Sequence, residues 1–384
     1  MTAPPTAQPS PTAAPTPTTA PTPTPVPVPP AFNAPTQISA TDLADLRVAI
    51  DGAGAVNVIG TTERKGRGLI HLTNSGGVWT EEEVTTPPAK GSDHGIVVAT
   101  DTDGSLWVGF ARYEVWNPCF FECAPPRSRL DGLYVINNAS GAWSEPVRLP
   151  EELDAGREFD MAVRDGTLHL AYRLEADPPQ IAYATNAGGA WQHEPVGPGF
   201  WPDLVLGGAG DPRVVMIVVD GEDYSVALGL RTDSGWQIEP VPHSTGDPTS
   251  PHLGVNSADA TVVQHAHFEL GYPSDLTTFD GTGWSAPAEI APDSIDEMAV
   301  GPGDAVHVIF PVADTETSDG LWWAWLHGDT RVDQLIDASV REVEDGPSAP
   351  QSLALDAAGL PHIVYATPYD EGREGLWYVS GGAP

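Results

Sequence analysis

The sequence predicts an all-β protein, a seven-bladed β-propeller, and three observations support this prediction. From residue 36 onward, one pattern of four short apolar segments separated by Gly- and Asp-rich turns recurs seven times. Four strands per repeat are typical of a propeller blade. No segment shows a sustained apolar period of 3.6 residues, so we expect almost no helix. An open array of β-sandwiches is the alternative, but such regular repetition favours a closed ring.

Each repeat begins with an expected hairpin of two apolar strands. The seven hairpins cover residues 48–59, 97–110, 161–172, 204–218, 253–266, 298–310 and 353–365. Their turns carry pairs such as Asp51-Gly52 and Asp103-Gly104, which accept the positive φ that tight hairpins require. The second half of a repeat adds a third strand, a Gly-rich turn and a fourth strand. In five copies that fourth strand begins near a Trp, which we expect to belong to the core because it recurs at one repeat position.

The seventh repeat lacks a fourth strand, since it stops after residues 376–379, close to the end of the sequence. A spare strand-like segment, 36–39, precedes the first repeat. We predict that this N-terminal segment pairs into the last blade and closes the ring, because closure covers a strand edge that would otherwise be exposed. The predicted propeller domain therefore spans residues 35–384.

Residues 1–34 are predicted to be a disordered linker. They are rich in Pro and Thr and carry no charged side chain, a composition that favours an extended polyproline II chain. Such a spacer holds a domain away from an anchor or a wall, so we expect an extracellular or cell-surface-anchored protein. No signal segment is visible, because Met1 is followed directly by the Pro/Thr tract.

The charge of the chain narrows its partners. The formal net charge is −36, which argues against nucleic acid and against anionic membrane surfaces. No run of 18 apolar residues is present, so no transmembrane span is expected. We expect a monomer that binds a glycan or a cell-surface protein.

Three of the Gly-rich turns share a pattern. They read Thr73-Asn74-Ser75-Gly76-Gly77-Val78-Trp79, Asn137-Asn138-Ala139-Ser140-Gly141-Ala142-Trp143 and Thr185-Asn186-Ala187-Gly188-Gly189-Ala190-Trp191. This pattern resembles a degenerate Asp-box, the Ser-x-Asp-x-Gly-x-Thr-Trp turn of sialidase-like (BNR repeat) propellers, with Asn in the place of Asp. The resemblance implies the propeller fold. The Phe/Tyr-Arg-Ile-Pro motif of sialidases is absent, so the resemblance assigns no catalytic residue.

The long connections of a propeller lie on one face, and here they hold most of the few cationic side chains together with aromatic ones. Arginine beside exposed aromatic rings suits stacking on sugars or gripping carboxylates. The residues predicted to bind a ligand on this face are Arg112, Arg173, Trp116, Trp201 and Tyr272.

The innermost strands enter the central channel from the same face, and their first positions are mostly polar. Arg47 and His252 are predicted to contact a ligand at this mouth. Asp160, Asp203 and Glu297 are candidate catalytic residues, because two carboxyl groups can act as acid and base in glycoside cleavage. Calcium is another possible ligand for these carboxylates, and a hydrated channel rim is the alternative to both.

Cysteine and histidine pairs suggest two further features. Cys119 and Cys123 lie in the longest insertion, and a local disulfide is expected if the protein is exported. His265 and His267 point to one face of a strand, but no third ligand is identified, so no metal site is predicted.

Together these observations favour a non-catalytic recognition module without a cofactor. A glycoside hydrolase with carboxylates at the channel mouth and a structural spacer domain are the alternatives.

Overall fold

The computed structural model describes residues 28–41, 43–62, 68–88, 91–116, 127–153, 158–220, 223–243, 248–267, 274–292, 295–312, 320–340, 350–367 and 373–382. In this part of the chain the regular structure is β-strand, apart from the two short 3-10 turns Glu151–Leu153 and Pro302–Asp304. No helix among these residues is long and apolar enough to cross a membrane.

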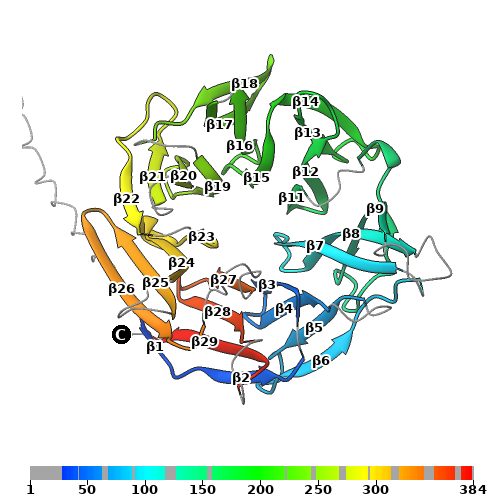
Figure 1. The fold of residues 1–384 in the computed structure, drawn as a ribbon, viewed down its shortest axis with the longest axis vertical. Helices are drawn as coiled ribbons and strands as arrows, with labels where there is room; N and C mark the ends of the chain where they lie inside the picture. The colour runs from blue at the N-terminus through cyan, green and yellow to red at the C-terminus, as the bar shows by residue number, and fades with distance from the viewer. Residues whose placement is uncertain are drawn as a thin grey trace, which may run out of the picture.

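The described strands form seven antiparallel sheets arranged as blades around a central channel (Figure 1). Blades 1 to 3 contain β3 (Asp45–Ile50), β4 (Val56–Thr61), β5 (Ile70–Thr73) and β6 (Thr80–Glu83); β7 (Gly91–Thr100), β8 (Leu106–Trp116), β9 (Arg127–Asn137) and β10 (Val147–Arg148); and β11 (Phe159–Arg164), β12 (Thr167–Leu174), β13 (Gln180–Thr185) and β14 (Gln192–Pro198). Blades 4 to 6 contain β15 (Phe200–Leu206), β16 (Pro212–Asp220), β17 (Asp223–Thr232) and β18 (Gly235–Pro240); β19 (Pro248–Val255), β20 (Thr261–His267), β21 (Ser274–Phe279) and β22 (Ala288–Ala291); and β23 (Glu297–Val300), β24 (Val306–Val312), β25 (Gly320–His327) and β26 (Thr330–Asp337). The predicted seven-bladed propeller is confirmed.

The seventh blade joins the two ends of the described chain. Its inner strands are β27 (Gln351–Leu355), β28 (Pro361–Ala366) and β29 (Leu376–Gly382), and β2 (Thr36–Ser39) pairs antiparallel with β29. The predicted closure by the N-terminal segment is therefore confirmed. β1 (Ala31–Phe32) also pairs with β29, although these two residues fall inside the range predicted to be linker. Residues 1–27 lie outside the described residues.

The core consists of seven apolar clusters, one at each contact between adjacent blades in the described chain. Both faces of a blade are therefore buried, which explains why β4 is buried along its whole length. The five repeated Trp side chains pack, partly buried, against these clusters at Trp79, Trp143, Trp191, Trp236 and Trp284.

The Asn residues of the three turns that resemble an Asp-box stabilise their blades. Asn74, Asn138 and Asn186 each accept a hydrogen bond through Oδ1 from a backbone N–H at the start of the second strand of their own blade, at 2.8, 2.7 and 2.8 Å. This side-chain-to-backbone bond fixes the turn against the neighbouring hairpin, as Asn and Asp do in many turns.

Candidate ligand pocket at the channel mouth

Four of the innermost strands carry a side chain near their start that links their blade to the next one. This side chain accepts a hydrogen bond from a backbone N–H of the following blade. The bonds run from Leu204 N to Asp160 Oδ2 (2.6 Å), Leu253 N to Asp203 Oδ2 (2.9 Å), Leu353 N to Glu297 Oε2 (2.7 Å) and Val48 N to Ser352 Oγ (3.0 Å). These bonds satisfy donors at the inner edges of the strands. The three candidate catalytic carboxylates thus have a structural task of their own.

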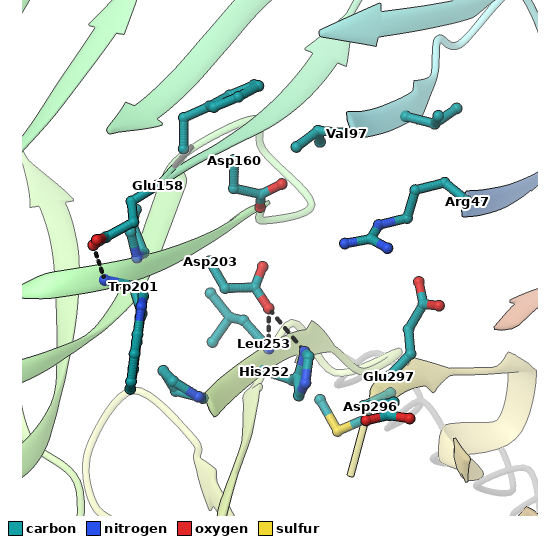
Figure 2. A pocket seen from close by; sticks show the side chains of 15 residues that line it. Arg47, Val97, Glu158, Asp160, Trp201, Asp203, His252, Leu253, Asp296 and Glu297 are labelled. Atoms are coloured by element: carbon teal, nitrogen blue, oxygen red, sulfur yellow. Dashed lines mark hydrogen bonds and ion pairs between the residues drawn. The ribbon is translucent and has the colours of Figure 1, made fainter. Parts of the chain in front are cut away.

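The three carboxylates among these side chains line a cavity of about 590 Å³. Its wall includes Asp160, Asp203 and Glu297 together with the predicted ligand contacts Arg47, His252 and Trp201. Figure 2 shows the carboxyl groups, the guanidinium group of Arg47 and the ring of His252 directed toward one space. The structure therefore brings together six of the residues selected from sequence. It does so because equivalent strand positions in successive blades converge on the axis of the ring.

Asp203 lies between two ionisable neighbours. Burial raises the pKa of Asp160 well above its ordinary value, and the charge of Asp203 raises it further. His252 Nδ1 lies 3.7 Å from Asp203 Oδ2. Burial alone would lower the pKa of His252, but its contact with Asp203 and the charge of Glu297 outweigh burial and raise it. The mouth thus holds a carboxyl group that favours its protonated form beside a second carboxyl group, a pairing that acid–base chemistry can use.

Trp201 has the most unusual conformation at the rim. Its φ of 51° lies in the left-handed region that bulky residues rarely adopt, yet 46% of the residue is exposed. The pairing of β15 with β16 shifts register between Phe200 and Asp203, which releases this residue from the regular ladder. Backbone strain of this kind persists only where surrounding contacts impose it, and it concentrates at ligand sites.

Glu158 provides one of these contacts. Its Oε2 accepts a hydrogen bond from Trp201 N at 3.3 Å, while its Oε1 accepts one from Arg173 Nη1. Arg173 was predicted to contact a ligand directly, but it does not line the cavity. It instead positions Glu158, which in turn holds the backbone of Trp201.

Arg112 was also predicted to grip a ligand on the exposed face, and the structure corrects this placement. Only 7% of the residue is exposed, and its guanidinium group donates two hydrogen bonds to Asp93, at 2.7 and 3.0 Å. It also lies over the ring of Tyr134, 4.6 Å from the centroid. Because Asp93 itself is buried, Arg112 serves as its counter-ion inside blade 2.

The other predicted residues lie outside the described residues. Trp116 ends β8, but its side chain is not described, and Tyr272, Cys119 and Cys123 belong to stretches that are not described at all. The predicted disulfide and these two ligand contacts therefore stay predictions.

Sequence reasoning missed two carboxylates of the cavity wall, Glu158 and Asp296. A signal for both was present. Glu158 precedes Asp160 by two residues, the spacing that places side chains on one side of an extended chain, and Asp296 directly precedes Glu297.

The charge of the wall limits what the cavity can hold. Glu158 is paired with Arg173 and Asp160 favours its protonated form, but the other carboxyl groups of the wall, those of Asp203, Asp296 and Glu297, still outnumber Arg47 and His252. The field of the wall therefore favours neutral or cationic ligands over anionic ones. The three carboxylates predicted as candidates for calcium do not form a group of potential metal ligands within 4.8 Å of one another, whereas a group in blade 5 of the described chain does.

Comparison with known proteins supports the fold alone. No family model matches the chain, and no curated protein does. Among solved structures, a protein of unknown function from Dyadobacter fermentans is similar over 91% of this chain and 98% of its own, with 13% identity and a TM-score of 0.56. A lectin of Aleuria aurantia in complex with Fucα1-6GlcNAc covers 77% of this chain and 96% of its own, with 10% identity and a TM-score of 0.48. The NanB sialidase of Streptococcus pneumoniae covers 88% of this chain and 68% of its own, with 11% identity and a TM-score of 0.42.

Proposed function

We propose that this protein recognises a neutral or cationic glycan at the channel mouth without cleaving it, and that the Pro/Thr-rich segment before β1 presents the propeller at a cell surface. The observation that carries the proposal is Trp201, an exposed ring held in a strained backbone conformation beside a polar cavity. A ligand could stack on the exposed part of this ring, whose other contact is the edge-to-face packing against Phe200, with ring centroids 4.9 Å apart.

The polar wall suits the hydroxyl or amino groups of a sugar. Each carboxylate that bonds to the next blade does so through one oxygen, which leaves the second oxygen for a ligand. The acidic wall would repel a sugar acid, so sialylated glycans are disfavoured. The positioning of Trp201 by Glu158 and Arg173 prepares the ring before binding, which reduces the entropy lost on association.

The test is a glycan array that carries neutral, amino and sialylated glycans, probed with the full chain and with Trp201→Ala. We expect one class of neutral or amino glycans to bind, and the variant to bind at least about tenfold more weakly, a loss of about 1.4 kcal/mol. Tyr224→Ala is the matched control, because Tyr224 is 41% exposed on the same blade but does not line the cavity. Equal binding by Trp201→Ala and the native chain would refute this site, as would a preference for sialylated glycans.

A glycoside hydrolase is the second candidate, and the contact between Asp160 and Asp203 favours it. The two functions are separated by reading the array again after a day. Glycans that are shortened by the native chain but stay intact with Asp160→Asn would identify a hydrolase. This variant keeps an oxygen for the N–H of Leu204, so it removes the acid while preserving the bond between blades. Glycans that remain bound and intact would support recognition.

A further inference from the structure

Four ligand-type side chains meet between blades 4 and 5, away from the channel mouth. His265 and His267 lie on one face of β20, Asp275 lies opposite His265 on β21, and His243 follows β18 in the connection to blade 5. One ligand atom each of His265, His267 and Asp275 lies within 4.8 Å of the other two. The ring centroid of His243 lies 6.0 Å from that of His265 and 6.0 Å from that of His267.

His265 is buried in this cluster without a hydrogen-bond partner. His265 and His267 are completely buried, and Asp275 is 2% exposed. Neither ring nitrogen of His265 has a hydrogen-bond partner, although an imidazole always carries at least one N–H. A buried polar group without a partner destabilises the folded state, and a bound ion is one of the standard explanations for such a group in a native protein.

The hydrogen bond between His267 Nε2 and Asp275 Oδ2, at 2.9 Å, does not explain His265. A metal ion binds imidazole through a ring nitrogen that carries no proton, and neither ring nitrogen of His265 is engaged by another protein group.

We propose that His265, His267 and Asp275 bind a divalent transition metal ion, zinc being the best match, with His243 as the fourth ligand. Imidazole nitrogens with one carboxylate suit zinc and its neighbours, whereas calcium and magnesium require mainly oxygen ligands. Because the first three residues are buried, no coordination position opens to substrate, and the site is structural. It joins β20 and β21 of blade 5 to the segment that arrives from blade 4. This site is independent of the glycan proposal.

The test uses the full chain without a polyhistidine tag, stripped with a chelator and then supplied with one equivalent of zinc. After desalting, we expect about one zinc per chain by elemental analysis, and a higher thermal unfolding temperature than that of the stripped protein. His265→Gln should bind zinc at least tenfold more weakly. His307→Gln is the matched control, because His307 is also buried, with an unpartnered Nδ1, but lies in blade 6. It should bind zinc as the native chain does.

A second measurement decides the question if His265→Gln fails to fold. The native chain is titrated with cobalt(II), whose visible absorption is strong in a four-coordinate protein site and weak in a six-coordinate one. Strong absorption that one equivalent of zinc abolishes would support the proposal. Weak zinc binding that is equal in the native chain and both variants, or a cobalt spectrum like that of the free ion, would overturn it in favour of surface histidines.

Discussion

Removing the counter-ion of a buried arginine tests the corrected position of Arg112. Asp93 is fully buried as a side chain, Arg112 is 9% exposed as a side chain, and two hydrogen bonds of 2.7 and 3.0 Å join them. Thr85 Oγ1 donates a third bond to Asp93 at 3.0 Å. In Asp93→Ala the guanidinium group would keep its aromatic neighbours Phe110 and Tyr134 but lose the carboxylate that compensates its charge.

The expected loss follows from the asymmetry of buried ion pairs. Breaking such a pair by deleting one partner costs about 3–5 kcal/mol, because the remaining charge is left without compensation. Replacing both partners by apolar side chains is often close to neutral. Asp93→Ala should therefore lower the free energy of unfolding by about 3–5 kcal/mol, and the double variant with Arg112→Met should recover a large part of that loss.

The assay is urea unfolding at neutral pH, followed by tryptophan fluorescence, for both single variants and the double variant. The slope of the free energy against urea should stay constant, since a change would mean altered compactness rather than stability alone. A loss below about 1 kcal/mol in Asp93→Ala, or additive losses in the double variant, would refute the reasoning. Such a result would mean that Arg112 reaches water, as the sequence had predicted.

Three further predictions concern closure, pH and the bonds between blades. Deleting residues 1–39 removes β1 and β2 and exposes the edge of β29, so it should lower stability by at least about 2 kcal/mol and promote aggregation, whereas deleting residues 1–27 should change neither thermal unfolding nor elution on size exclusion. Burial alone would raise the pKa of Asp337, but hydrogen bonds from Arg373, Tyr365 and Ser339 together lower it to about 2. The ionised Asp337 side chain therefore contributes roughly 2 kcal/mol to the free energy of unfolding above its unfolded pKa of about 4, and this contribution is lost as the pH falls toward 2. The urea midpoints of the native chain and of Asp337→Asn should converge between these two pH values. A constant difference between the midpoints would contradict this. Asp160→Ala should have a free energy of unfolding about 1 kcal/mol lower than that of Asp160→Asn, and a lower urea midpoint, because only Asn can still accept a hydrogen bond from Leu204 N. Equal midpoints would show that the bond between blades contributes nothing to stability.

The repeat pattern in the sequence is sufficient to predict most of the fold. Each hairpin carries its own turn pairs and apolar segments, so strand order inside a blade is a local property that the sequence displays directly. The closure of the ring by β2 was also predictable, because the missing strand of blade 7 and the spare segment before blade 1 are both visible in the sequence.

The channel mouth was predictable for a related reason. Arg47, Asp160, Asp203, His252 and Glu297 occupy equivalent positions in their repeats, and equivalent positions in a ring must converge on the axis. Connections between strands obey no such rule. They differ in length and composition from blade to blade, so the sequence could not show that β8 and β12 extend over Arg112 and Arg173, that Arg112 turns inward, or that Arg173 acts on Trp201 through Glu158.

The sequence by itself therefore determined the ring, its closure and the residues around its axis, because these follow from repetition along the chain. Only the tertiary structure decided which side chains meet between blades. His265 and His267 are neighbours in sequence, but Asp275 reaches them through the pairing of β20 with β21, and His243 through the packing of blade 4 on blade 5. These contacts depend on the twist of each sheet and on the angle between neighbouring blades, and no local pattern of residues encodes either.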